Sequence, residues 1–184
     1  MVKMAAQGSK GLTPIAEVPS RSKSYAAMVA TPAVDRGKPH KNNVQAKGRV
    51  IVAWNYSFCS MNVVSIDDQH VLVEVDLIFS SSFFISAVYG FNDYVQRRSL
   101  WRSLSSSVVQ GKPWILARNF NVIRSSAGAS DVSCPSNIAM ADFNRRIEEI
   151  DVVELSHFGC NYTWSPNWRN RKCILRKLDY AFLQ

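Results

Sequence analysis

From residue 48 onward the chain alternates between apolar runs and short polar turns, a pattern typical of β-strands. Every second residue from Val71 to Phe79 is large and apolar, which is the two-residue period of a strand with one solvated side. The run 83–89 is almost wholly apolar, as a buried central strand is. Runs at 49–54 and 62–66 add two more strands. Because short loops join the four runs, we expect antiparallel neighbours.

Two later segments have the period of a helix. Asp93 is a suitable N-cap, and the apolar residues after it recur at helical spacing: Leu100, Trp101, Leu104 and Val108. A second helix is expected to begin near Asn137, with one apolar face: Met140, Phe143, Ile147 and Ile150. Further short strands are expected at 114–117, 151–155, 161–164 and 174–182. Strands interleaved with helices predict an α+β domain in which a sheet packs on helices.

Residues 1–47 differ in composition from the rest. They hold four of the seven prolines and no sustained period, so we expect a disordered leader followed by a domain at 48–184. Eight of the 22 basic residues but only two of the 14 acidic ones lie here, so the net charge of +8 belongs mainly to the leader. Such an arm attracts DNA or RNA without sequence preference, although a solvated linker explains it as well. The short patch 25–30 is expected to form a turn of helix or a docking peptide.

No membrane association or export is expected. The longest apolar stretch, at 83–91, is too short to span a bilayer, and the first residues lack the apolar core of a secretion signal. The sequence therefore predicts an intracellular protein, nuclear or cytoplasmic. Its four cysteines form no C-x-x-C pair and are expected to be structural thiols.

Polar residues follow the apolar strands at three places where chemistry is expected. Tyr89 and Asn92 leave the most buried strand and can reach one phosphate oxygen, although Gly90 and Asn92 also suit a simple turn. Asn119 and Asn121 follow the strand at 114–117, where sheet enzymes place working groups; a turn is the plainer interpretation. Asp179 interrupts the apolar run 174–182 and needs a cationic or histidine partner, or forms an edge-strand ion pair.

A basic cluster accompanies the aromatic residues Trp164 and Trp168. Aromatic and basic side chains together can stack on bases and hold phosphates, although an exposed loop with solubilising charge explains the same pattern. The candidate nucleic-acid-binding residues are Arg169, Arg171, Lys172, Arg176 and Lys177.

Taken in order, several segments resemble one family. The segments are Gly48–Asn55, Val88–Asn92, Arg97–Trp101, Pro113–Ile123, Tyr162–Ser165 and Lys177–Phe182. Together they resemble the endonuclease/exonuclease/phosphatase superfamily, which has the DNase I-like fold. Within it, the resemblance is to the endonuclease domain of plant LINE-type (non-LTR) retrotransposons. The resemblance covers residues 48–184 and not the leader.

This resemblance implies a four-layered α/β sandwich, with two sheets between helices, and Mg²⁺-dependent phosphodiester cleavage at the strand ends. It places family catalytic positions at Tyr89, Asn92, Asn119, Asn121 and Asp179. However, the family's Gly-Asp-Phe-Asn motif reads Arg118-Asn119-Phe120-Asn121 here. An uncharged amide replaces the working carboxylate, and Arg118 replaces a glycine that lets the backbone turn tightly.

Other family positions have no counterpart in this sequence. They are the early Asn, the metal-binding Glu and the late Ser-Asp-His segment, and none of His40, His70 and His157 fits the catalytic position. We therefore expect a truncated domain with no metal ligands in place, no bound Mg²⁺, and exposed sheet edges that make it prone to aggregate.

The sequence thus predicts a degenerate endonuclease-like domain without catalytic activity. Three alternatives stay open: a nucleic-acid-binding remnant that uses the leader and the basic cluster, an active nuclease with substitute carboxylates such as Asp93 or Asp131, and an interaction module built on residues 25–30. The sequence indicates no particular protein partner and no oligomeric state.

Overall fold

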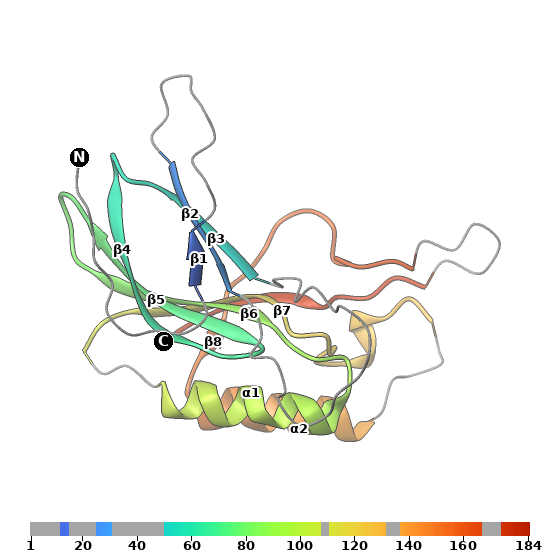
Figure 1. Ribbon diagram of the computed structural model, residues 1–184. Coiled ribbons are helices and arrows are strands. Elements are labelled where there is room, and N and C mark those ends of the chain that lie inside the picture. Colours follow the sequence, from blue (N-terminus) through green and yellow to red (C-terminus); the bar gives the residue numbers. More distant parts are fainter. Residues whose placement is uncertain (1–11, 15–24, 31–49, 108–110, 132–136, 167–173) are drawn as a thin grey trace, which may run out of the picture.

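The computed structural model describes residues 12–14, 25–30, 50–107, 111–131, 137–166 and 174–184. These residues form three layers, seen edge-on in Figure 1: two helices, a six-stranded sheet, and a small three-stranded sheet on the far side. The mixed α/β class expected from the sequence is confirmed. A helix layer beyond the small sheet, which would complete a four-layered sandwich, is not part of the described residues.

The six-stranded sheet has the order β4-β5-β6-β7-β9-β8. Its strands are β4 (Cys59–Ile66), β5 (His70–Leu77), β6 (Phe83–Tyr89), β7 (Trp114–Asn119), β8 (Val153–Glu154) and β9 (Asp179–Leu183). All neighbours are antiparallel except β6 and β7, because α1 (Tyr94–Ser106) carries the chain back to the other end of the sheet between them. The expected antiparallel order of the second, third and fourth apolar runs is confirmed.

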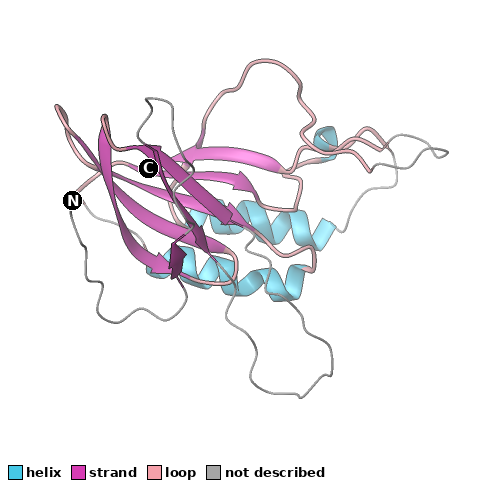
Figure 2. Ribbon diagram, turned by 45° about the horizontal axis from the view of Figure 1, so that its top comes forward, coloured by secondary structure: helices cyan, strands magenta, loops and turns pink. Residues whose placement is uncertain are grey.

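α1 and α2 (Asn137–Glu149) run side by side along one face of this sheet (Figures 1 and 2). The expected N-cap is present, because Asp93 Oδ1 accepts a hydrogen bond from the backbone N–H of Gln96 at 2.8 Å. The predicted apolar faces are buried at Leu100, Trp101, Leu104, Phe143, Ile147 and Ile150. Met140 is only half-buried, and Val108 lies outside the described residues.

An aromatic cluster fills the space between helices and sheet. Phe120 and Phe143 lie at its centre, with ring centroids 5.3 Å apart, and Trp101, Tyr180 and Phe182 surround them. Such pairs contribute about 0.5–1.5 kcal/mol each beyond the area they bury. Because Phe120 directly follows β7, this cluster anchors the loop at the end of that strand.

β5 is covered on both faces. Val71, Val73 and Val75 pack in a second cluster with residues of the small sheet, as the alternating pattern predicts. Leu72 points the other way and is buried beneath the helices, so the prediction of one solvated side is wrong there. The strand also ends at Leu77, and Phe79, expected to face the core, is 97% exposed. A period of two shows which residues share a face but not what covers that face.

The small sheet contains β1 (Leu12–Pro14), β2 (Tyr25–Ala30) and β3 (Val50–Asn55) in the order β1-β2-β3. The first two strands lie within the stretch expected to be disordered, and residues 25–30 form a strand in register with β3 rather than a turn of helix. The remainder of 1–49 lies outside the described residues. The chain changes sheets at the turn 56–58, so β3 and β4 are not the paired neighbours that their short connection suggested.

Three of the expected short strands are shorter than predicted. In the segment 151–155 only β8, Val153–Glu154, is a strand. In the segment 161–164 only Trp164 pairs, with Arg176, and the last strand begins at Asp179 rather than at Ile174. The reason is that the chain before Asp179 leaves the sheet: the backbone N–H of Lys177 donates to the carbonyl of Gly128 at 2.8 Å.

None of the described helices is long and apolar enough to cross a membrane. Apolar side chains are nevertheless exposed on two neighbouring turns, which the hydrogen bond from the N–H of Ile78 to the carbonyl of Phe58 holds together. We call Tyr56, Phe58, Ile78 and Phe79 the apolar tip; Phe58 is 70% exposed. Residues 50–66 and 77–92 contain no charged residue, so nothing in these segments opposes association through the tip.

Replacing Phe58 and Phe79 together by serine should reduce aggregation. Because both side chains are exposed, the free energy of unfolding should change by no more than about 0.5 kcal/mol per site. Light scattering during concentration checks the first effect, and urea unfolding checks the second. Unchanged scattering would show that the apolar tip does not drive association.

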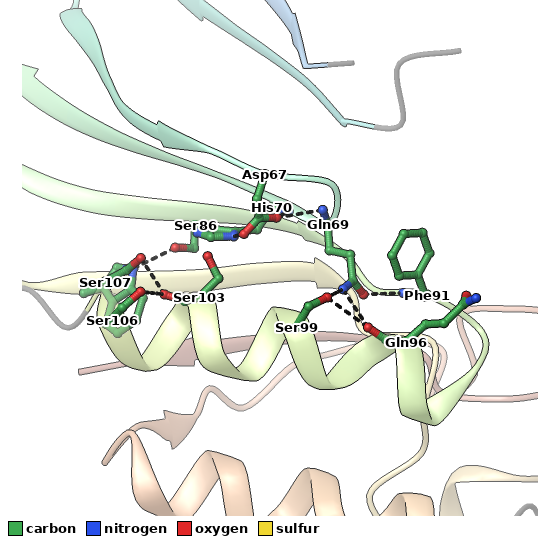
Figure 3. A network of polar contacts seen from close by, with 11 residues as sticks. Asp67, Gln69, His70, Ser86, Phe91, Gln96, Ser99, Ser103, Ser106 and Ser107 are labelled. Atoms are coloured by element: carbon green, nitrogen blue, oxygen red, sulfur yellow. Dashed lines mark hydrogen bonds and ion pairs between the residues drawn. The ribbon is translucent and has the colours of Figure 1, made fainter. Parts of the chain in front are cut away.

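A polar network joins the start of β5 to α1 and to the loop after β6 (Figure 3). The buried Gln69 side chain donates to Ser99 Oγ at 2.7 Å and accepts from the N–H of Phe91 at 2.7 Å. One residue further, His70 Nδ1 lies 2.7 Å from Asp67 Oδ2, and the N–H groups of Gln69 and His70 donate to Asp67 Oδ1. These bonds set the position of the end of β6, where Tyr89 lies, and of the loop that follows it.

Burial alone would raise the pKa of Asp67, but the hydrogen bond and charge of His70, with bonds from Ser103 and Gln69, lower this pKa to about 2. A depressed carboxyl pKa stabilises the fold above the unfolded value of 3.8, and this contribution is lost as the pH falls towards 2. Because the side chain is one-third exposed, we expect a loss of about 1–2 kcal/mol.

The variant Asp67→Asn should therefore be less stable than the parent at pH 5 and nearly equal to it at pH 2. Urea unfolding of both proteins at the two pH values measures the difference. A deficit that is the same at both values would show that Asp67 contributes through packing and not through its charge.

Candidate active site

Three of the predicted site residues lie side by side across neighbouring strands. Tyr89 on β6 is in register with Asn119 on β7, and Asn119 is in register with Asp179 on β9. Residues in direct register on neighbouring strands carry their side chains on the same face of the sheet. The fold therefore places a phenol, an amide and a carboxylate in one row, which we call the edge row.

The edge row lies where β6 and β7 end and where β9 begins. Sites of α/β proteins are found at such strand ends, because loops leave the sheet there and open a crevice. Tyr89 is 38% exposed, and Asn119 and Asp179 are half-buried, so solvent reaches the row. Thr163 fixes the position of Asp179 in the row, because Thr163 Oγ1 accepts a hydrogen bond from the backbone N–H of Asp179 at 3.1 Å.

A close backbone contact joins the loops after β6 and β7. The N–H of Gly90 donates to the carbonyl of Asn119 at 2.8 Å, and a Cβ at position 90 would lie 2.8 Å from the carbonyl oxygen of Phe120. Only glycine allows this approach. The glycine of Tyr-Gly-Phe-Asn is therefore needed for the packing of the two loops. The sequence had suggested only that it suits a turn.

Asn119, the last residue of β7, and Asn121 in the loop after it both form side-chain hydrogen bonds with the backbone. Asn119 Oδ1 accepts the N–H of Asn121 at 2.7 Å, and Asn121 Nδ2 donates to the carbonyl of Gly90 at 2.6 Å. Asn121 adopts a left-handed conformation with φ of +53°, which asparagine tolerates better than most residues. A simple turn at these residues was the plainer interpretation of the sequence, and the structure contains that turn. It holds the side-chain oxygen of Asn119 in place.

A buried guanidinium braces both loops. Arg97 on α1 is 3% exposed and donates to the carbonyls of Phe91, Asn92 and Asn121 at 2.9–3.0 Å. Burial lowers its pKa below the usual value, while the charges of Asp93 and Asp142 oppose that shift. Sequence reasoning did not assign this role to Arg97; the available signal was a charged residue four positions after the helix cap, next to the buried Leu100.

Asn92 and Asn121 lie outside the edge row. Asn92 is exposed on the loop, and Arg97 holds its carbonyl rather than its side chain. Asn121 packs back on Gly90. Of the five family positions, the structure therefore brings three into one row and leaves two in the supporting loops.

Arg118 has a φ of +101°, in a region that side chains with a Cβ rarely adopt. This is the position where the resemblance implies glycine, and the backbone adopts a conformation that glycine favours. Such a residue costs about 1–3 kcal/mol and persists because the surrounding structure requires it. In this chain Gly90 and the strand pair β7–β9 supply that requirement.

Replacing Arg118 by glycine should raise the free energy of unfolding by about 1 kcal/mol, because the relief of strain exceeds the greater chain entropy of glycine. Urea unfolding measures the gain. Arg118→Ala is the matched control, since alanine removes the long side chain but keeps the Cβ. An equal gain in both variants would mean that the guanidinium, and not the backbone, is the source of the strain.

The edge row offers few ligands for Mg²⁺. This ion prefers octahedral coordination by oxygen, whereas the row has a single carboxylate, that of Asp179, and the side-chain oxygen of Asn119 is already bound in the turn to Asn121. Over the described residues, no group of three or more His, Cys, Asp or Glu side chains could hold a metal ion. His70 is fully buried against Asp67, and Asp93 serves as the cap of α1.

Part of the basic cluster is committed to contacts within the fold. Lys177 Nζ pairs with Glu154 Oε1 at 2.7 Å, and the backbone of Arg176 exchanges hydrogen bonds with Trp164. Arg169, Arg171 and Lys172 lie outside the described residues, as does Trp168. Binding of nucleic acid by this cluster stays a prediction.

No protein-family model and no curated protein sequence matches the chain. Among solved structures, its fold is similar to the endonuclease domain of TRAS1, a telomere-specific non-LTR retrotransposon. The two structures align with a TM-score of 0.57 at 11% sequence identity, over 85% of this chain and 66% of that one. The chain thus spans just under two thirds of the length of that domain.

This likeness is one of fold. The predicted DNase I-like fold is confirmed, because the alignment covers 85% of this chain with a TM-score of 0.57. The identity is too low to carry over an activity or a ligand, and the likeness to plant elements stays a prediction.

Proposed function

We propose that this chain is an endonuclease-like domain of non-LTR retrotransposon origin whose edge row does not cleave phosphodiester bonds. The fold similarity supports the origin. The absence of cleavage is proposed from the amide at the centre of the edge row. Asn119 lies between Tyr89 and Asp179, and its side-chain oxygen is bound in the turn to Asn121.

An amide at this position changes what the row can do. It has no proton that titrates near neutral pH, so it cannot act as a general base, and it carries no charge to attract a cation. Removing one positioned acid–base group typically costs a factor of about 10²–10⁴ in rate. The Tyr89 hydroxyl can still donate a hydrogen bond to a phosphate, but the row has a single carboxylate.

The open alternative of substitute carboxylates receives no support at Asp93, whose Oδ1 caps α1. The alternative of a nucleic-acid-binding remnant depends on residues of the leader and the basic cluster, most of which lie outside the described ranges. Both stay open to experiment, and neither is favoured by a contact in the described residues.

The purified chain should not nick supercoiled plasmid in the presence of Mg²⁺ above an EDTA control, measured by agarose electrophoresis. EDTA-sensitive nicking that is lost in Tyr89→Phe would refute the proposal, because it would show an active site that uses the edge row.

The variant Asn119→Asp tests whether the amide at position 119 is what prevents the edge row from binding a metal ion. Aspartate can keep the turn to Asn121 with one oxygen and presents the other beside Asp179, which gives the row two carboxylates. We expect a saturable rise in thermal unfolding temperature with Mn²⁺ in this variant and none in the parent. Asn92→Asp adds the same charge on the exposed loop and is the control. If the parent responds as strongly as Asn119→Asp, the amide is not what prevents metal binding.

A further inference from the structure

A polar pocket lies beyond the end of the sheet, apart from the edge row. It has a volume of about 140 Å³ and is formed by the loop after β7, by β8, by the loop that follows β8, and by the chain entering β9. Its lining residues are Arg124, Ser125, Ala127, Gly128, Glu154, Asn161, Lys177 and Tyr180. In Figure 2 the short helix η1 (Ser126–Gly128), which borders it, stands among loops away from the two long helices.

Three charged groups meet in this pocket. Glu154 bridges the two cations: its Oε2 lies 2.6 Å from Arg124 Nη1, and its Oε1 lies 2.7 Å from Lys177 Nζ. Burial would raise the pKa of Glu154, but the hydrogen bonds from Lys177 and Arg124 lower it, so the carboxylate is ionised at neutral pH. With no other acidic residue in the lining, one positive charge is left in excess.

Tyr180 bonds to the backbones of both cationic residues and adds no charge itself. The N–H of Arg124 donates to its hydroxyl oxygen at 3.0 Å, and the hydroxyl donates to the carbonyl of Lys177 at 3.0 Å. Burial, partly opposed by the bond from Arg124, raises the pKa of Tyr180 to about 12, so the phenol stays neutral. Asn144 also fixes the guanidinium, because its Oδ1 accepts Arg124 Nε at 2.9 Å.

Several donors remain unused around the cavity. Arg124 Nη2 and the side chains of Ser125 and Asn161 have no hydrogen-bond partner among the described residues. Lys177 Nζ has three hydrogens and one carboxylate partner. Guanidinium, ammonium, hydroxyl and amide donors from three chain segments therefore face one space. With one positive charge in excess, this lining favours an anion over a cation.

We infer that the Arg124–Lys177 pocket binds a phosphate group. A phosphate oxyanion has several acceptor oxygens that point in different directions, and its double negative charge gains more from the excess positive charge than a carboxylate does. The site is separate from the edge row and does not depend on the proposed function. The group is either free inorganic phosphate or a phosphate carried by a nucleotide.

The first measurement is the thermal unfolding temperature of the full chain titrated with inorganic phosphate at constant ionic strength. A saturable rise is expected, because a ligand that binds the folded state stabilises it. The same titration with the 5′-phosphorylated dinucleotide pTpT distinguishes the sources: tighter binding of pTpT that competes with phosphate indicates a carried phosphate, and equal binding indicates the free ion.

Two substitutions move the affinity in opposite directions. Ser125→Asp places a carboxylate in the pocket without removing any ion pair and should weaken phosphate binding about tenfold or more. Glu154→Gln removes the internal negative charge and should tighten binding about tenfold. Ser105→Asp on α1 and Glu148→Gln on α2 make the same changes of charge on exposed helix positions outside the lining and are the controls.

Other results would overturn the inference. If neither the parent nor Glu154→Gln shows a saturable phosphate effect, the pocket does not bind phosphate. If Ser105→Asp and Glu148→Gln change the affinity as much as the pocket variants, phosphate responds only to the net charge of the protein. If Glu154→Gln unfolds the chain, Ser125→Asp with its control is sufficient, because residue 125 is exposed and makes no side-chain capping bond.

Discussion

The close approach of two loops, the one after β6 and the one after β7, is the constraint on which the candidate active site depends. A glycine at position 90 allows the backbones to touch, and the buried guanidinium of Arg97 then bonds carbonyls of both loops. A buried charge costs several kcal/mol unless all its donors are used, so Arg97 favours one arrangement of these loops over others. From the other side, Phe120 anchors the second loop in the aromatic cluster.

That constraint sets the geometry of the edge row independently of the chemistry of its side chains. The edge row is set by strand register, which depends on the backbone and the buried core and is indifferent to the charge of residue 119. Arg118 illustrates the same point, because its backbone adopts a conformation suited to glycine although the side chain is long and charged. Residue 119 can therefore carry an amide or a carboxylate on the same backbone, whereas any side chain at position 90 would push the two loops apart.

The two polar sites differ in how their charges are balanced. The edge row has one carboxylate and no cation in register with it, while the Arg124–Lys177 pocket has two cations around one carboxylate. Both lie at the same end of β9, within a few residues of each other in sequence. A cationic partner is expected for Asp179 from the sequence, but the nearby Lys177 pairs with Glu154 and belongs to the pocket. The change of chain direction before β9 separates Asp179 from Lys177.

Local pattern was enough to predict the helices, most strands of the large sheet, and the residues that end up in the edge row. Helical and strand periods depend on neighbouring residues, and polar residues after apolar strands mark strand ends wherever the strands lie. The order of the matching segments along the chain, through their resemblance to the endonuclease/exonuclease/phosphatase superfamily, also indicated Tyr89, Asn119 and Asp179 as candidate site residues.

Tertiary structure alone decided the rest. The pairing of β2 with β3, the burial of Leu72 and the exposure of Phe79 depend on which layer covers each face, and the sequence period carries no such information. The role of Arg97 and the meeting of Arg124, Glu154 and Lys177 depend on contacts between residues far apart in the chain. Sequence determined which residues share a face or end a strand; only packing decided what each of them touches.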